Sequence, residues 1–561
     1  MRNIQKIIVA LGASLLFQGA YVFAAGQYFV EEDFKNQTIE GTNPIANYVS
    51  SKSLGTPDEI YITGKEASGN TINANQIVSG GLIDSGSSKL VVSNSKFLNN
   101  VATVSSGSIY SGILTGSNVE ISDSEFSGNT ASVNATSGNY WVYGGILRSA
   151  ANSVVSLDNV KLDSNSAKST HRVQGGSIQV FNGGVLNVKN SSITNNTAEA
   201  KSVARGGAIE NYNGTVNISD TVFENNSVSG ISELESSTET FGGAIYMSKT
   251  NSVTNLTDVS FIGNSAKKGY GGALCLESGS TLNLKAQKNA VFSGNYATNS
   301  NGEKVDENGG FLYIKSDSKV NFDVDGGVVL TIGDGTAGYD SIAATNSSNA
   351  LITKAGSGEM VVNSSMVNYE SNLNVNEGSM TVNGGLGANA LSIASGASFA
   401  STGVFDIGTL AVSSNGKISC ITTGVGKNCV NSSLENTAVH GNVLVINVGY
   451  CGSNVISKGE MCKVNKVAKI ETPNAISKIS DFGGVPCFSS DKFVEETDIK
   501  EPCVFDMELF YFHKKFPNLI SYKIVSDNLS HSEYEGFKNF NANDSWKHFF
   551  KTIAPALQNK N

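Results

Sequence analysis

Two short sequence words recur about every thirty residues between residues 80 and 320 of this 561-residue chain. The first is Phe-x-x-Asn, with Leu or Ile replacing Phe in two copies, and the second is Gly-Gly-small-aliphatic. A period of this length is typical of solenoids, in which each repeat forms one coil that packs on its neighbours. The first word begins at Phe97, Phe126, Leu162, Ile193, Phe223, Phe261 and Phe292, and ends at Asn100, Asn129, Asn165, Asn196, Asn226, Asn264 and Asn295.

The residues before each Phe-x-x-Asn word alternate between apolar and polar. Leu90 and Val92 precede Phe97 by seven and five residues, and aliphatic residues stand at the same two positions before most other words. Thr254 breaks this pattern before the sixth word, and the seventh word fits it loosely. Such alternation predicts strands with one buried face, and we expect two or three short strands in each coil. The predicted fold is therefore all-β, a single-stranded parallel β-helix. The alternative is an array of β-sandwich domains. Such an array would require neither a single repeated word of about thirty residues nor insertions confined to one point of each repeat.

In such a helix, equivalent residues of successive coils lie one above another, about 4.8 Å apart. The Phe-type residues are expected to form an internal ladder. The final Asn of each word tolerates a left-handed turn, and its amide can bond to the next Asn. The Gly pair permits a tight corner, where Ala208 and Ala244 keep the interior small. Insertions fall between the Asn and the next Gly pair, which predicts variable loops on one face.

From about Val320 the words change while the period of two continues, so the helix is expected to continue over residues 320–450 with shorter coils. No Pro occurs from Asp58 through Thr472, as expected where each coil donates backbone hydrogen bonds to its neighbours. With 39% hydrophobic and 16% charged residues, 60 Gly and 7 Pro, the composition excludes disorder, collagen and a mainly helical protein. The net charge of −10 and the few Arg disfavour nucleic-acid binding.

Residues 1–24 have the pattern of a signal peptide. Arg2 and Lys6 form a basic segment, residues 7–17 are mostly apolar, and a cleavage site follows Ala24. This apolar run is too short to cross a bilayer, and no other segment reaches the required length, so no transmembrane helix is predicted. The alternative is a buried N-terminal helix. We expect an exported protein in which residues 25–79 cap a β-helix whose loop-bearing coils span residues 80–319.

The C-terminal region, residues 451–561, is rich in aromatic residues, and six Cys lie in or just before it. Their spacing contains no Cys-x-x-Cys, so it indicates neither a zinc nor a redox site. In an exported chain they predict up to three disulfides with fifteen connectivities, of which neighbour pairing closes the shortest loops. Cys275 is expected to be a buried free thiol, and Asp544 to begin a short packing helix. The six are Cys420, Cys429, Cys451, Cys462, Cys487 and Cys503.

The paired words resemble the repeats of the polymorphic membrane protein group of autotransporters, and residues 352–360 (Ile-Thr-Lys-Ala-Gly-Ser-Gly-Glu-Met) resemble the autotransporter-associated strand repeat. The resemblance covers about residues 80–450. It implies a right-handed β-helical passenger displayed on the surface of a Gram-negative bacterium, often as an adhesin. Such proteins end in a translocator barrel, but the last hundred residues lack its alternating segments. We therefore expect a barrel on another chain, a truncated gene or a released product.

An enzyme on this fold, such as a polysaccharide lyase or hydrolase, would need acid–base or metal-binding residues on adjacent coils. Residues 25–419 contain one His, three Arg, no Asp–Asp pair and no nucleophile motif in a strand-to-helix setting. The best candidate for a cation site is a group of four aspartates. Their spacing matches neither the calcium-binding nonapeptide repeat nor the EF-hand loop, and it is more typical of solvated turns. They are Asp323, Asp325, Asp334 and Asp340. We predict no catalytic residue, metal or cofactor.

One patch favours binding. Tyr140, Trp141 and Tyr143 are expected in a long loop, and His171 and Arg172 occupy the same position one coil later. Aromatic faces beside a planar cation suit a glycan or protein contact. The alternative is that Trp141 and Tyr143 point into the core.

Together these features predict an exported, non-enzymatic adhesin, at the cell surface, in the outer membrane or outside the cell. Its partner would be a protein or glycan of a host or neighbouring cell. The alternatives are a carbohydrate-active β-helix enzyme and a passive structural stalk.

Overall fold

The computed structural model contains two compact units, Met1–Gly403 and Val404–Asn561, which we describe separately. Most of the predicted signal peptide lies outside the described residues, as do Cys420, Cys429 and the predicted helix at Asp544. The structure describes residues 20–23, 27–30, 33–40, 58–135, 138–231, 239–315, 317–345, 350–366, 368–401, 405–413, 415–418, 446–453, 461–469, 477–478, 485–489, 503–506, 509, 520–527 and 529.

Each coil in the centre of the first unit contains five short strands, so the prediction of two or three was wrong. The turns between them leave the alternation of buried residues almost unbroken, and the periodicity therefore did not reveal them. Several turns hold a residue with positive φ, such as Ser164 at 55° and Gly175 at 82°. One typical coil consists of β18 (Val154–Asp158), β19 (Lys161–Asp163), β20 (Ser166–Ser169), β21 (Arg172–Gln174) and β22 (Ile178–Phe181). We name the corresponding five faces A to E in this order.

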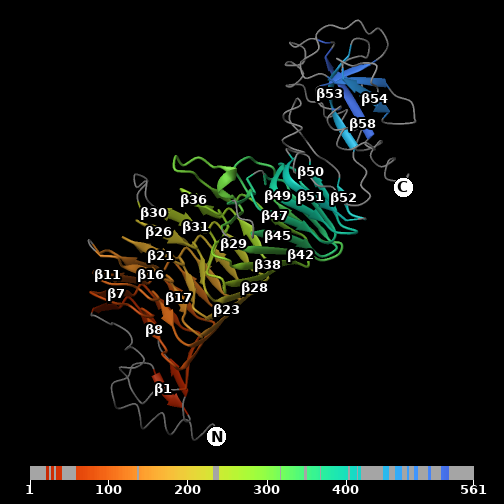
Figure 1. The fold of residues 1–561 in the computed structure, drawn as a ribbon. Coiled ribbons are helices and arrows are strands. Elements are labelled where there is room, and N and C mark those ends of the chain that lie inside the picture. The colour runs from red at the N-terminus through yellow and green to blue at the C-terminus, as the bar shows by residue number, and fades with distance from the viewer. Residues whose placement is uncertain are drawn as a thin grey trace. The chain divides into compact units, whose positions relative to one another are not determined.

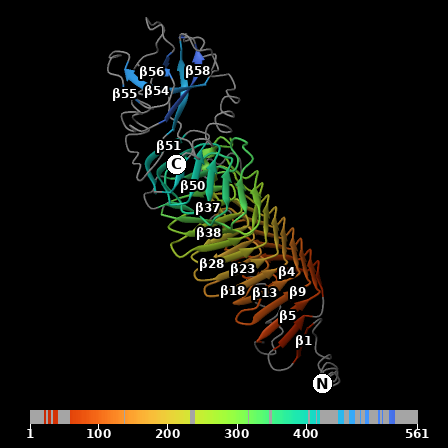
Figure 2. The same cartoon turned by 90° about the vertical axis from the view of Figure 1, so that its right-hand side faces the viewer.

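From β2 (Gln27–Val30) onward, strands of successive coils pair in parallel on every described face of the first unit, which is a parallel β-helix (Figure 1, Figure 2). Face A continues from β2 to β49 (Leu386–Ile393), and face E extends from β8 (Ile83–Asp84) to β44 (Ile342–Ala344). The register places equivalent residues directly above one another, with Leu162 between Phe126 and Ile193.

The Phe-type residues form an internal ladder on face B. The rings of Phe97 and Phe126 stack with centroids 4.5 Å apart, and those of Phe223 and Phe261 lie 5.1 Å apart. Leu162 and Ile193 fill the levels between these two pairs. The loosely fitting seventh word departs from the stack, because Phe292 is buried but meets Phe261 edge-on at 88°.

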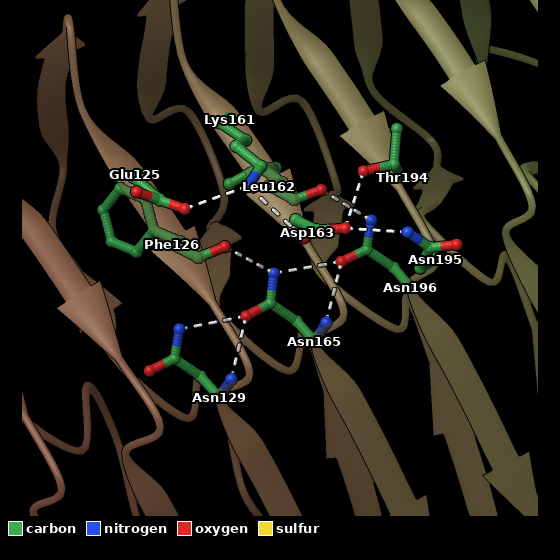
Figure 3. A network of polar contacts seen from close by, with 10 residues as sticks. All are labelled: Glu125, Phe126, Asn129, Lys161, Leu162, Asp163, Asn165, Thr194, Asn195 and Asn196. Carbon is green, nitrogen blue, oxygen red and sulfur yellow. Dashed lines mark hydrogen bonds and ion pairs between the residues drawn. The ribbon is translucent and has the colours of Figure 1, made fainter.

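The final asparagines of the words form a second, fully buried ladder (Figure 3). Nδ2 of Asn129 donates to Oδ1 of Asn165 at 2.9 Å, and Nδ2 of Asn165 donates to Oδ1 of Asn196 at 3.0 Å. Each Oδ1 also accepts a backbone N–H, and each Nδ2 donates a second bond to a carbonyl, as from Asn165 to Phe126 at 2.9 Å. The ladder therefore satisfies every amide while it joins each coil to the next.

The left-handed conformation belongs to the residue before each ladder asparagine and not, as the sequence suggested, to the ladder asparagine itself. Asn99, Ser164 and Asn195 have φ of 54°, 55° and 56°. This turn directs the following side chain into the helix, where its amide can reach the neighbouring coil.

Both glycines of the Gly-Gly words are needed at the corner between faces D and E. Gly206 has φ of 59°, which favours glycine. A Cβ on Gly207 would lie 2.1 Å from the carbonyl oxygen of Gly243 in the next coil. Successive coils thus approach closely at this corner, and the small residue Ala208 follows it in the buried interior.

Beyond Val320 the coils shorten to fewer strands. Lys354, from the segment that resembles the autotransporter-associated strand repeat, is buried, and its Nζ donates to the carbonyls of Ala355, Gly356 and Glu377 at 2.8, 2.7 and 3.1 Å. Burial lowers the pKa of Lys354 to about 8. The described strands of this part in the first unit are β42 (Lys319–Val324), β43 (Val329–Ile332), β44, β45 (Leu351–Ala355), β46 (Glu359–Val362), β47 (Asn372–Val375), β48 (Ser379–Val382), β49 and β50 (Ser398–Ser401).

The second unit contains a sheet with both parallel and antiparallel pairs. Cys451, Cys487 and Cys503 are buried in it, and their pairing stays a prediction. Lys523 and Asp506 form a buried ion pair at 2.7 Å. The longer strands are β53 (Ile446–Gly452), β54 (Met461–Lys469), β56 (Val485–Ser489) and β58 (Ile520–Asp527). Within the described parts of the chain, no helix has the length and apolar character needed to cross a membrane.

Candidate binding surface

The longest described connections within the central coils lie between faces C and D. Residues 134–140 separate β15 (Thr130–Val133) from β16 (Trp141–Tyr143), whereas only residues 170–171 separate β20 from β21. Residues 231–238 form the equivalent connection three coils after residues 134–140, although 232–238 lie outside the described residues. The sequence insertions therefore lie along one edge of the helix, beside face D.

Trp141 and Tyr143 lie on strand β16 of face D rather than in the expected long loop. Val142 between them is fully buried, whereas Trp141 and Tyr143 are half-buried. Because adjacent side chains of a strand alternate between its two sides, both aromatic rings lie on the outer side of the helix. The alternative in which they point into the core is wrong.

Trp141, His171 and Arg172 meet at adjacent levels of the helix. Arg172 is the register partner of Trp141, and its guanidinium carbon lies 5.1 Å from the Trp141 ring centroid. The His171 and Tyr143 rings lie 6.3 and 5.3 Å from that of Trp141. Burial, assisted by Arg172, lowers the pKa of His171, which favours the neutral imidazole. The hydroxyl of Tyr140 instead lies 3.3 Å from Ser106 Oγ.

Arg148 extends this cluster across the Gly-Gly corner onto face E, and the sequence analysis did not select it. It lies on β17 (Leu147–Ser149), and its guanidinium carbon is 4.5 Å from the Phe181 centroid and 5.4 Å from that of Tyr143. Tyr110 stacks on Tyr143 at 5.1 Å. We define the corner surface as Tyr110, Trp141, Tyr143, Arg148, His171, Arg172, Phe181 and Tyr212.

The repeat words contain a signal that would have identified this position. The residue directly after each Gly-Gly-small-aliphatic word is the second residue of a face E strand, where Arg148 is partly exposed and the other five residues are buried. These residues stack in register between neighbouring coils. They are Arg148, Gln179, Glu210, Tyr246, Cys275 and Tyr313.

Glu210 is the buried carboxyl of this row. It accepts hydrogen bonds from Gln179 at 2.8 Å and from Gln174 at 3.2 Å. Burial raises the pKa of Glu210 to about 7, although Arg205 and Arg148 lie near enough to favour the charged form. The pair of glutamines holds this carboxyl beneath the outer side chains.

A row of asparagines on the outer side of face A is a second surface with repeated polar groups. It borders a hollow of about 520 Å³. Asn217 donates to Asn187 at 2.9 Å, and Asn255 donates to Asn217 at 2.8 Å. Because these amides bond to one another, they are less suited to ligand binding than the corner surface.

The structure does not bring the four candidate cation ligands together. Asp325 forms an ion pair with Lys285 at 3.4 Å, and Asp323 lies 3.8 Å from the same Nζ. Asp340 is fully buried at the end of the asparagine ladder, where it accepts bonds from Asn295 Nδ2 at 2.8 Å and Gly294 N–H at 2.7 Å. Burial raises the pKa of Asp340 to about 6. Cys275 is a buried free thiol on face E.

Comparisons with known proteins agree with the repeat architecture. The model of the Chlamydia polymorphic membrane protein repeat matches residues 258–277. The chain is also 30% identical over 169 residues to the probable autotransporter YfaL of Escherichia coli (strain K12), a match that covers 29% of this chain and 11% of that protein. No solved structure matches. These matches confirm the resemblance to an autotransporter passenger of the polymorphic membrane protein type.

Proposed function

We propose that this chain, whose repeats are of the polymorphic membrane protein type, is an exported β-helical adhesin that attaches through the corner surface. The observation that carries the proposal is the concentration of rare residues there. Residues 25–403 contain one Trp, one His and three Arg. Trp141, His171, Arg148 and Arg172 belong to the corner surface, and Arg205 lies one coil further along face D. The outward position of the aromatic rings beside these cations supports binding over a purely structural role.

The proposed role is non-enzymatic. Glu210, which lies near enough to Arg205 and Arg148 to interact with them electrostatically, is fully buried and held by two glutamines, so a ligand on the surface would not reach it. The pKa of His171 is lowered, and the outer surface around it consists of rings and guanidinium groups. Such groups bind and orient a ligand, but they offer no paired acid and base for bond cleavage.

Adhesion by the purified full-length chain tests this role. We expect binding to cells or extracellular matrix that falls at least about tenfold in Trp141→Ala, because an exposed aromatic anchor contributes strongly to a contact. Lys189→Ala is the control, since Lys189 lies on face A and pairs with Asp158 at 3.0 Å. Equal adhesion by both variants and the unmodified chain would exclude the corner surface. No adhesion by any of them would favour a passive stalk.

Incubation of the same protein with uronic-acid polymers addresses the enzymatic alternative. Release of shortened or unsaturated products would show a carbohydrate-active enzyme and overturn the non-enzymatic role. We expect the polymer length to remain unchanged.

A further inference from the structure

The arginines of the helix differ from its lysines in their charge partners. Within the described residues, several lysines on other faces pair with carboxylates: Lys161 lies 3.0 Å from Glu125 (Figure 3), and Lys168 lies 3.2 Å from Glu199. In the same described part of the chain, no carboxylate lies within 4.0 Å of the guanidinium nitrogens of Arg148, Arg172 or Arg205. Although the protein is acidic, with a net charge of −10, its three helical arginines form no ion pair with any described residue.

Aromatic rings hold these guanidinium groups in place. Arg172 lies over Trp141, and Arg205 lies 4.9 Å from the Tyr246 centroid. Ring stacking uses the flat face of a guanidinium and leaves the N–H groups at its edge for hydrogen bonds. The Nε atoms of Arg172 and Arg205 are buried and have no hydrogen-bond partner. The rings, and for Arg148 the hydrogen bond from Nε to Gln179 Oε1 at 2.7 Å, therefore fix the orientation of the cations.

The arginines are also distributed along the helix axis. Arg148 on face E and Arg172 on face D lie in successive coils, and Arg205 lies one coil later on face D, two strand positions from the level of Arg172. Coils are about 4.8 Å apart, so the three cations are spread over three successive coils. Tyr110, Tyr143 and Phe181 lie beside Arg148. A polymer with regularly spaced anions could contact several coils at once.

We infer that the corner surface binds an anionic glycan, with carboxylate or sulfate groups at the arginines and sugar rings on the aromatic faces. This inference rests on the proposed adhesive function and specifies its ligand. Guanidinium groups recognise carboxylates and sulfates through paired N–H donors. The neighbouring aromatic faces favour a glycan over an acidic peptide, because the C–H faces of sugar rings provide flat apolar area.

Binding of the full-length chain to four immobilised polymers tests the inference. Polygalacturonate supplies carboxylates, heparin supplies sulfates, dextran is the neutral control and poly-glutamate is the acidic peptide. We expect binding to at least one of the two anionic glycans, weakening at higher salt, and little binding to dextran or poly-glutamate. The preferred glycan identifies whether the anion is a carboxylate or a sulfate.

Two variants separate specific recognition from general attraction. Arg172→Gln and Trp141→Ala should each weaken binding at least about tenfold, with unchanged thermal unfolding, whereas Lys189→Gln removes the same charge as Arg172→Gln and should leave binding intact. Loss of binding in Lys189→Gln as well would show nonspecific attraction and overturn the inference. Binding to poly-glutamate as tight as to either glycan would instead identify an acidic peptide. If cell adhesion depended on Trp141 but neither glycan competed with it, the assignment of the ligand would be wrong while the adhesive function would stand. If adhesion did not depend on Trp141, the proposed function itself would be wrong.

Discussion

Phe223→Ala removes a fully buried ring from the internal ladder. The ring stacks on Phe261 with centroids 5.1 Å apart and has Ile193 as its register partner on the other side. Truncation of a buried Phe costs about 3–5 kcal/mol, since apolar burial is lost and a cavity remains. The lost ring pair places the expected cost toward the upper end of that range. Because coils contact only their neighbours, the destabilisation should be local.

Hydrogen exchange of the full-length chain measures this effect. Amides of β29 (Val222–Glu224) and β34 (Ser260–Ile262) should exchange faster by the factor that corresponds to this energy, while amides several coils away stay protected. Limited proteolysis should produce new cuts near residues 200–260. Val291→Ala is the control, because Val291 is 56% exposed and its truncation should cost less than about 0.5 kcal/mol. If Phe223→Ala behaved like this control, the inward ladder would be refuted.

Asn196→Ala should lower the free energy of unfolding by at least about 3 kcal/mol, because several buried groups, among them two N–H groups of Asn165, lose their hydrogen-bond partners. Chemical unfolding measures this loss. A change below about 1 kcal/mol would contradict the asparagine ladder. Burial raises the pKa of Asp340 from its usual value of 3.8 to about 6, so the folded chain binds this proton more readily than the unfolded chain. The free energy of unfolding should therefore fall as the pH rises from about 4 to about 6. Asp340→Asn should remove this part of the pH dependence. If the free energy of unfolding of both proteins changed equally with pH, Asp340 would not be the group responsible. Gly207→Ala should lower the free energy of unfolding by more than about 3 kcal/mol, because the new Cβ would collide with the backbone of the next coil. Gly302→Ala is the control, because nothing lies within 4 Å of its new Cβ. This variant should lose only about 1–2 kcal/mol, which corresponds to the strain of its φ of 84°. Similar melting temperatures for the two glycine variants would show that the coils do not meet at this corner.

The features that repeat from coil to coil were predictable from the sequence. Phe97 and Asn100 can be recognised from the sequence because equivalent residues recur in each coil. They recur because each coil contacts its neighbours in the same way, so equivalent positions need the same side-chain shape and the same hydrogen bonds. The five-strand coil was missed because its strands have only three to five residues and the turns between them barely interrupt the alternation of buried side chains. The role of Asp340 was also hidden, since its partner Asn295 is 45 residues earlier in the chain.

The candidate site shows the same division. Trp141 and Arg172 could be selected from the sequence because they are rare residue types at equivalent positions of adjacent coils. Arg148 could not be grouped with them, because it belongs to another face and meets Tyr143 only where the chain turns at the Gly-Gly corner. Residue type and period do not state which outward side chains face each other across a corner.

The solenoid, its buried face, the ladders and the edge where the loops emerge can be predicted from the amino-acid sequence, because they follow from local alternation and from contacts that repeat with a fixed period. Folding in three dimensions is what brings Tyr143, Arg148 and Phe181 of faces D and E together, and what places the arginines of the helix on aromatic rings without carboxylate partners among the described residues. These contacts depend on the angle between two sheets and on the stacking of separate coils, which no short segment of the chain encodes.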